Sequence, residues 1–395
     1  MFAYINKATL YIFAWILYET QGILIPKGNF FTQILVTVLL LVSFYHFFIV
    51  NTHYKISPFF KGLNALLIMF SVYGLFLIIG GYDPNDYVIK VPSFSYLKGI
   101  YISIMPIYSF YYFSKENFLT EKMLPFLIIC FLCFVTIQFL QHQRDLLIEA
   151  MLIKSSREEF TNNFGYSFLS LIPACVYFYK RPVLQYVALG YCFVFLLMGM
   201  KRGAVLIGAI CLVWFLWKNL QNESMKKKIT VLFLSIMLCF AGYTFFQKKI
   251  TESEYFQKRV ELTLEGNSSG RDKLFKEHAN YFWNEASPLQ FVFGSGANAT
   301  LRVSFNYAHN DWLEIAVNQG VLGLLIYLFY WFAFAKSILC STSPQSRLAL
   351  QLLFIIYFLK TFFSMSYGDM SVPATFILGF SLAQEKKNEQ ICNCN

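Results

Sequence analysis

Residues 291–335 read FVFGSGANATLRVSFNYAHNDWLEIAVNQGVLGLLIYLFYWFAFA, a polar, turn-rich segment that runs directly into a long apolar one. His309 stands at the junction, just ahead of the pattern D-W-L-E that begins at Asp311 and ends at Glu314. This pattern predicts a capping box, in which each side chain accepts a hydrogen bond from a free backbone N–H of the first helical turn. The positive end of the helix dipole disfavours an imidazolium, so we expect His309 to be neutral at pH 7 and able to serve as a general base. The alternative interpretation is an amphipathic anchor at a membrane surface.

The composition is that of a membrane protein. The 395 residues are 57% hydrophobic and 19% aromatic, and only 14% are charged, whereas soluble domains average about 25%. Apolar windows long enough to cross a bilayer recur along most of the chain, which predicts an all-α polytopic membrane protein with about twelve transmembrane helices in a single integral membrane domain, residues 1–395. The predicted spans are 8–25, 30–50, 62–80, 97–113, 123–140, 164–179, 182–199, 203–217, 229–246, 313–335, 347–365 and 371–383.

The positions of lysine and arginine predict the orientation. With the N-terminus in the cytoplasm, most cations fall in inner connections, for example Lys115, Lys180 and Arg347. Both termini are then cytoplasmic, and two segments lie on the outer side: a short one at 141–163 and a large one at 247–310 that contains short helices. The net charge of +10 is therefore mainly a topology signal, and no basic segment with interleaved aromatics indicates a nucleic-acid partner.

Two clusters of cations stand out on the outer side. Lys201, Arg202 and Gly203 fall in a short outer turn, where the charge bias predicts few cations. Arg202 at a helix N-terminus offers a planar fork for a diphosphate, although an arginine that snorkels to the interface is the alternative. Arg271 opens an amphipathic helix in the large outer segment, where its charge opposes the helix dipole, so an anionic partner is expected. His278, in the same helix, is predicted to face solvent.

Further candidates lie in other outer turns. Arg157 precedes an asparagine pair that ends at Asn163, and its guanidinium could hold either a lipid headgroup or a substrate phosphate. Asp369, in the last outer turn, is a candidate to orient His309 or Arg202. Lys360 falls inside a predicted span, which suggests a carboxylate or phosphate partner nearby.

The sequence lacks the motifs of several common enzyme classes. There is no Walker A loop and no H-E-x-x-H zinc motif. Gly294-Ser-Gly296-x-x-Ala299 superficially fits a dinucleotide fingerprint, but no βαβ unit surrounds it, so we predict a turn that returns the chain towards His309. Cys130-x-x-Cys133 lies in an apolar span, where small apolar packing is the better interpretation. We therefore expect no metal, no cofactor and no disulfide framework.

The spacing of the residues that follow His309 resembles a motif of a known protein family. His309-Asn310, nine residues, Gly320, two residues and Gly323 resemble the H-[NSQ]-x9-G-x-x-G element of the bacterial O-antigen ligases. These enzymes share one membrane superfamily with the O-antigen (Wzy-type) polymerases.

Three other elements carry the same resemblance in the same order. Arg202-x3-Leu206 is similar to the R-x3-L element of the ligases, and Arg271 with the preceding glycine is similar to their G-R element. Arg157 followed by Asn163 resembles an arginine, a spacer and N-P-N ahead of a helix, although the proline is missing here.

The resemblance implies a glycosyltransferase of the O-antigen ligase or polymerase type in the bacterial inner (cytoplasmic) membrane. Its donor would be a glycan on undecaprenyl diphosphate, and its acceptor lipid A–core or another lipid-linked repeat unit, joined on the periplasmic side without a metal and with inversion. His309, Arg202 and Arg271 would be catalytic. Residues expected to bind substrate are Arg157, Asn163, Lys201, Asn310 and Asp369. The alternative is a transporter or flippase for lipid-linked oligosaccharide, a class that usually shows internal repeats, and no convincing repeat occurs here.

Overall fold

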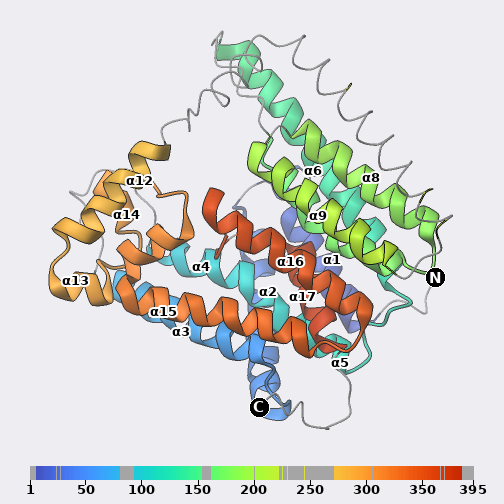
Figure 1. Cartoon of the computed structure of the whole chain (residues 1–395), viewed down its shortest axis with the longest axis horizontal. Coiled ribbons are helices and arrows are strands. Elements are labelled where there is room, and N and C mark those ends of the chain that lie inside the picture. Colours follow the sequence, from blue (N-terminus) through green and yellow to red (C-terminus); the bar gives the residue numbers. More distant parts are fainter. Residues whose placement is uncertain are drawn as a thin grey trace.

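The computed structural model describes residues 6–23, 25–26, 28–80, 93–153, 162–199, 201–221, 225, 229, 244, 271–304, 306–364, 366–368 and 370–384. These residues form the following helices: α1 (Lys7–Glu19), α2 (Phe30–His53), α3 (Pro58–Ile79), α4 (Ser93–Ile104), α5 (Pro106–Lys115), α6 (Leu124–Ile153), α7 (Gly165–Leu171), the 3-10 helix η2 (Pro173–Phe178), α8 (Pro182–Met198), α9 (Arg202–Leu220), α12 (Arg271–Asn280), the π-helix η3 (Tyr281–Glu285), α13 (Pro288–Phe293), α14 (Thr300–Ser304), α15 (Asp311–Cys340), α16 (Pro344–Phe363) and α17 (Val372–Ala383). Figure 1 shows the long helices packed into one bundle.

Within the residues that the structure describes, five helices are long and apolar enough to cross a membrane: α2, α3, α6, α9 and α15. Shorter apolar helices occupy Gly165–Phe178, α8 and α17. The prediction of an all-α, multi-pass membrane protein is therefore confirmed, while the number twelve is not matched by the described residues. Most of the predicted span 229–246 lies outside them.

Prolines account for several differences between predicted and observed helices. The predicted span 97–113 is divided into α4 and α5 at Pro106, which stands at the start of α5 because its missing N–H cannot continue a helix. Pro173 likewise separates α7 from η2. By contrast, no proline or glycine interrupts residues 126–153, and α6 continues through 30 residues, so the first half of the predicted outer segment 141–163 extends this helix.

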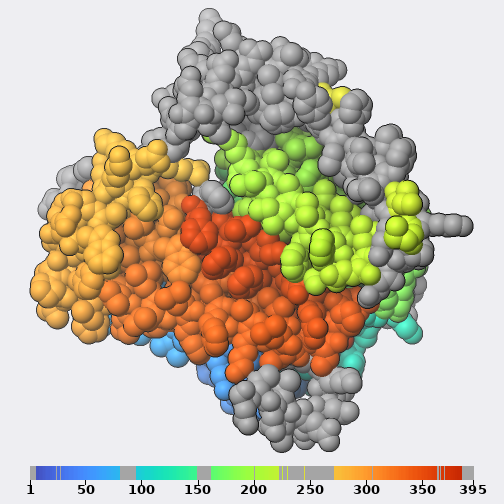
Figure 2. All heavy atoms as spheres, in the orientation of Figure 1, coloured from blue at the N-terminus to red at the C-terminus, as the bar shows by residue number. Residues whose placement is uncertain are grey.

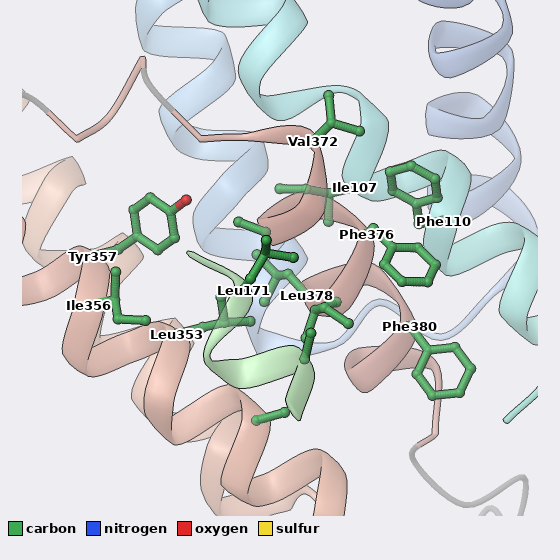
Figure 3. Packing of buried hydrophobic residues seen from close by; sticks show 14 of the residues in the cluster. Ile107, Phe110, Leu171, Leu353, Ile356, Tyr357, Val372, Phe376, Leu378 and Phe380 are labelled. Atoms are coloured by element: carbon green, nitrogen blue, oxygen red, sulfur yellow. The ribbon is translucent and has the colours of Figure 1, made fainter. Parts of the chain in front are cut away.

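The shortest predicted span lies at the centre of the bundle. All twelve residues of α17 are buried, and it packs against α5, α7 and α16. Figure 3 shows Phe376 and Leu378 of α17 among side chains from these neighbours, including Phe110 of α5 and Leu353 of α16. A helix that is apolar on every side is a buried helix, so α17 is enclosed by protein on all faces.

Small residues and buried hydroxyls join the other helices. At Gly62, a Cβ atom would lie 2.8 Å from the Cβ of Ala333, so α3 and α15 pack in close backbone contact. The Tyr11 hydroxyl lies 2.6 Å from the Ser43 hydroxyl and links α1 to α2. Tyr177 is linked in the same way to Ser381 of α17, at 2.7 Å. Such bonds satisfy polar groups that would otherwise be stranded among apolar side chains.

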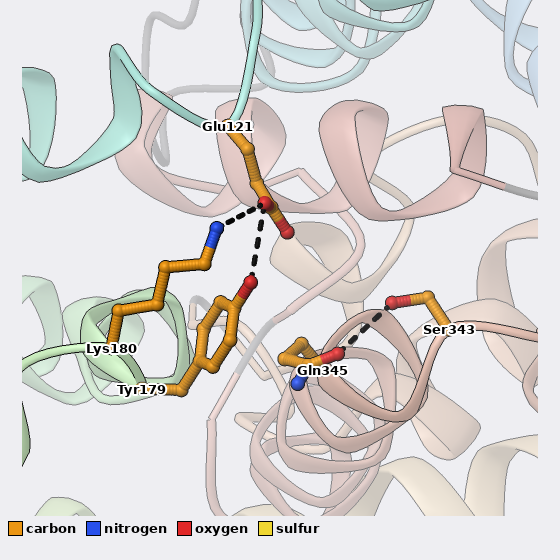
Figure 4. A network of polar contacts seen from close by, with 5 residues as sticks. All are labelled: Glu121, Tyr179, Lys180, Ser343 and Gln345. Carbon is orange, nitrogen blue, oxygen red and sulfur yellow. Dashed lines mark hydrogen bonds and ion pairs between the residues drawn. The ribbon is translucent and has the colours of Figure 1, made fainter.

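The two ends of the bundle have different polar chemistry. At one end, Lys180 pairs with the Glu121 carboxylate at 3.4 Å, and Tyr179 donates to the same oxygen (Figure 4). At the other end, Asn162 donates its N–H to the Gly199 carbonyl at 3.0 Å, which joins the turn before α7 to the turn before α9. We call this second end the site end, because the segment with His309 lies there. Residues 271–304, the α12–α14 lobe, project from the bundle (Figures 1 and 2).

Candidate functional site

Helix α15 folds back on itself. Gly320 has φ 69° and ψ −164°, which interrupts the helix and divides it into a short limb (residues 311–319) and a long limb (residues 321–340). In a straight helix, the Cα atoms of Asp311 and Tyr327 would be about 24 Å apart. Here the Tyr327 hydroxyl donates to the Asp311 carboxylate at 2.6 Å. The expectation of one uninterrupted span at 313–335 was therefore wrong.

The two motif glycines make this fold-back possible. Gly320 has a positive φ, and a Cβ atom there would lie 2.5 Å from the backbone nitrogen of Gly294, whose φ is also positive. Only glycine adopts this conformation without strain and allows two backbones to approach so closely. At Gly323, a Cβ atom would lie 3.1 Å from Ile315, because the limbs touch there. The G-x-x-G spacing thus corresponds to a reversal and a contact.

The interruption exposes backbone carbonyls that the lobe then satisfies. Ser295 donates its N–H to the Val317 carbonyl, and Gly296 donates to the Asn318 carbonyl, both at 2.9 Å. A carbonyl at the end of a helix has no intrahelical partner, so these bonds replace the missing ones. The turn that contains Gly296 was predicted to return the chain towards His309. It also docks the α12–α14 lobe onto the short limb.

His309 occupies a constrained position immediately before the short limb. Its φ is 52°, in the left-handed region that non-glycine residues seldom adopt. Asn310 caps the helix, since its side-chain oxygen accepts a hydrogen bond from the Leu313 N–H at 3.1 Å. The predicted capping box of Asp311 and Glu314 is therefore wrong. The Asp311 carboxylate turns away and accepts a hydrogen bond from the backbone N–H of Ser366 at 2.9 Å.

Glu314 holds the residue that precedes His309. Its carboxylate accepts hydrogen bonds from the Ala308 N–H at 2.9 Å and from the Thr300 hydroxyl at 2.5 Å. The Asn318 amide donates to it at 3.2 Å, and the whole group is buried. Hydrogen bonds to a buried carboxylate are among the strong ones in proteins, so Glu314 fixes the backbone that presents His309.

Burial and neighbouring groups lower the pKa of His309. Burial has the largest effect on this half-buried imidazole, followed by electrostatic interactions with Arg271, His278 and Lys201, in that order. Arg271 is the first residue of α12, and Lys201 is the N-cap of α9. The fold thus places cations from two segments far apart in sequence around one imidazole that is neutral at pH 7. Arg202 follows Lys201 directly, as the exposed first residue of α9.

Residues 187–328 match the family model described as O-antigen ligase. The match confirms the resemblance to the O-antigen ligase and polymerase superfamily. A comparison with curated proteins gives no match. The matched range includes Lys201, Arg202, Arg271 and His309, and it ends within the long limb of α15. The matched range therefore contains these cations and the reversal of α15 at Gly320.

Of the remaining predicted residues, Asn163 is exposed at the site end, whereas the residue before it has a structural role. The neighbour, Asn162, is buried, and its side-chain amide donates to the Phe139 carbonyl at 3.0 Å. The turn that carries Asn163 is also joined to the turn before Lys201 through Gly199. Arg157 and Asp369 lie outside the described residues.

His278 differs from its prediction. It was expected to face solvent, but it is fully buried, with Nδ1 2.7 Å from the Leu274 carbonyl oxygen and Nε2 3.3 Å from the Thr300 carbonyl oxygen. The charged neighbours of His278 on α12 suggested a polar surface. The packing of α14 over this face is a tertiary contact that the pattern could not indicate.

Lys360 of α16 is buried, and its Nζ lies 5.2 Å from the centroid of the Tyr166 ring. Its charge also acts on the Asp311 carboxylate. Asp311 is thus a carboxylate of the kind that the sequence suggested near Lys360. Sequence reasoning assigned neither Asp311 nor Glu314 to the site beyond helix capping, because acidic residues are common in the first turn of a helix and gave no separate signal.

Proposed function

We propose that the protein is a glycosyltransferase that moves a glycan from undecaprenyl diphosphate to a sugar hydroxyl. The acceptor is lipid A–core oligosaccharide if the enzyme is a ligase, or a second lipid-linked repeat unit if it is a polymerase. The observation that carries this proposal is the neutral His309 with Arg271 and Lys201 around it. We place the enzyme in the bacterial inner membrane, with both termini cytoplasmic and the site on the periplasmic side.

In the proposed reaction, His309 takes the proton of the acceptor hydroxyl while the hydroxyl oxygen forms a bond to the anomeric carbon of the donor. The bond between that carbon and the diphosphate oxygen breaks, and the electron pair leaves with undecaprenyl diphosphate. Arg202, Arg271 and Lys201 stabilise the charge that develops on this leaving group. Attack opposite to the leaving group inverts the anomeric configuration.

The two carboxylates of the short limb have a positioning role in this proposal. Glu314 is bonded to Thr300, Ala308 and Asn318, while Asp311 is bonded to Ser366 and Tyr327. Because these hydrogen bonds occupy both carboxylates, we assign the charge stabilisation to the cations and write the transfer as metal-independent. Asn310, as the helix cap, and Asn163, Arg157 and Asp369 remain proposed substrate-binding residues.

Helix α9 offers a route for the polyprenyl chain. Below Arg202, exposed apolar side chains recur at helical spacing on one face, at Leu206, Ile210 and Val213. Residues four and seven positions apart share a face of a helix. A polyprenyl chain could lie along this stripe within the lipid while its diphosphate contacts Arg202 at the head of the helix.

Reconstitution with defined substrates tests the function. Purified protein in lipid nanodiscs is supplied with a synthetic undecaprenyl-diphosphate glycan and either lipid A–core or a second lipid-linked unit. We expect release of undecaprenyl diphosphate together with a new inverted glycosidic linkage to one of the two acceptors, unaffected by EDTA. Movement of the donor across vesicles without any new linkage would support the flippase alternative instead. Activity lost in EDTA and restored by magnesium would contradict the metal-independent reaction.

A further inference from the structure

The α12–α14 lobe exposes a group of apolar side chains that the proposed reaction does not use. Leu289 is 73% exposed, Trp283 69%, Phe293 51% and Val292 43%. Helix α13, which carries three of them, reads PLQFVF and has no charged residue. Large apolar side chains that cluster on an exposed surface mark a site of contact with another apolar phase or molecule. We call these four side chains the α13 patch.

The long limb of α15 gives the depth of this patch relative to a bilayer. At 1.5 Å per residue, residues 321–340 span about 30 Å, which is roughly the thickness of the hydrocarbon core. Helix α3 packs along this limb, with Gly62 against Tyr330. From Tyr73, α3 continues to Ile79, about 9 Å further. The hydrocarbon boundary at the site end therefore lies at the level of Gly320 or above it.

The α13 patch is attached to the bundle at this same level. The Tyr73 hydroxyl donates to the Phe293 carbonyl at the end of α13, and Ser295 donates to a carbonyl of the short limb at 2.9 Å. Figure 1 shows α13 beside the ends of α15 and α3. On α3, the apolar side chains around this level are strongly exposed, with Phe76 at 69% and Ile79 at 79%. The patch is thus continuous with the lipid-facing surface of a membrane-spanning helix.

We propose that the α13 patch is inserted among the acyl chains of the bilayer leaflet at the site end, so that the lobe rests on the membrane. The occupant is bulk bilayer lipid, because the patch is uncharged and adjoins a surface that is already covered by lipid. Trp283 has the amphipathic ring that is enriched at membrane interfaces. This contact fixes the height at which the lobe holds Arg271 above the bilayer, and it does not depend on the reaction proposed above.

Photo-crosslinking in a native membrane tests the contact. p-Benzoylphenylalanine is introduced at Leu289 and, as a matched control on the same lobe, at the exposed Lys273 of α12. After irradiation, the purified full-length protein is analysed by mass spectrometry. We expect a phospholipid adduct at position 289 and none at position 273. An adduct with a second copy of the chain or with another protein at position 289, or equal lipid labelling at both positions, would overturn the proposal.

A second measurement needs no large substitution in α13. The protein and its Trp283→Phe variant are placed in nanodiscs that contain lipids brominated near the headgroup end of the acyl chains. We expect these lipids to quench the part of the fluorescence that the wild type has and the variant lacks. If that difference signal is equally bright with and without bromine, Trp283 is not in lipid and the proposal fails. Both measurements are independent of catalysis, so an inactive protein gives the same answer.

Discussion

The short limb of α15 carries Asp311, Glu314 and Asn318, all buried, whereas the long limb carries the single charge of Lys336 and exposes apolar side chains such as Leu325. In the short limb, hydrogen bonds from Thr300 to Glu314 and from Ser366 to Asp311 hold the start of the helix against the lobe and the segment before α17. In the long limb, close packing against α3 holds the helix in place. The difference indicates that one helical sequence contains both a membrane-spanning segment and the residues that hold His309 in place.

The largest effect should come from removing the imidazole at the start of the short limb. We expect His309→Asn to lower the turnover of glycan transfer by roughly 10²–10⁴-fold, the usual contribution of a general base. Asparagine tolerates the left-handed φ of this position, so the backbone should be kept. Turnover and binding of the lipid-linked donor are measured separately, and binding should remain close to wild type. Wild-type turnover without added base would remove His309 from the mechanism.

Breaking the reversal between the limbs should have the next largest effect, on stability. We expect Gly320→Ala to lower the thermal midpoint in detergent strongly, because its Cβ would meet backbone atoms of Gly294 and Val292 at 2.5 Å. Gly296→Ala is the matched control, since Gly296 also has a positive φ but has no atom within 4 Å of the added Cβ. The control should lose only the stability that corresponds to the added backbone strain, roughly 1–3 kcal/mol. Equal losses in the two variants would show that the close approach is not needed.

A smaller effect is expected from weakening the support of His309 within the short limb. Glu314→Gln replaces one accepting oxygen by an amide that cannot accept, which should lower kcat about tenfold, since hydrogen bonds to charged groups contribute about 1.5–3 kcal/mol. The KM for the donor should stay unchanged. Glu277→Gln is the control, because Glu277 forms an exposed pair with Lys273 that contributes little. A rise in KM with unchanged kcat would assign Glu314 to substrate binding.

The fold could be predicted from sequence as far as local pattern determines it. Apolar runs indicated most of the helices, and they placed α17 correctly at 371–383. They could not show that α17 is the central helix, because burial on all sides depends on its neighbours. They also could not show the fold-back at Gly320, since residues on both sides of it have helical character. The backbone angles of Gly320, its close approach to Gly294 and the hydrogen bond between Tyr327 and Asp311 reveal the reversal.

The sequence indicated the cationic residues of the candidate site, but it did not indicate the role of the two buried carboxylates. The sequence placed Arg202 and Arg271 at helix starts and Lys201 in the turn before Arg202, and in the structure Arg271 and Lys201 act on the pKa of His309. Asp311 and Glu314 were interpreted as a capping box because their spacing fits one. The competing cap, Asn310, and the buried partners Thr300 and Ser366 decided otherwise, and such partners are set by tertiary packing.

The smallest effect is expected from removing one of the charges near His309, at the start of the short limb. Lys201 lowers the pKa of His309, so Lys201→Met should raise this pKa towards its usual value. A general base acts in its neutral form, and activity is lost as pH falls through its pKa. The acid limb of kcat/KM should therefore move to higher pH in the variant. Lys273→Met, an exposed cation elsewhere on α12, should leave the limb in place. A shift to lower pH, or the same shift in both variants, would contradict an action of Lys201 on His309.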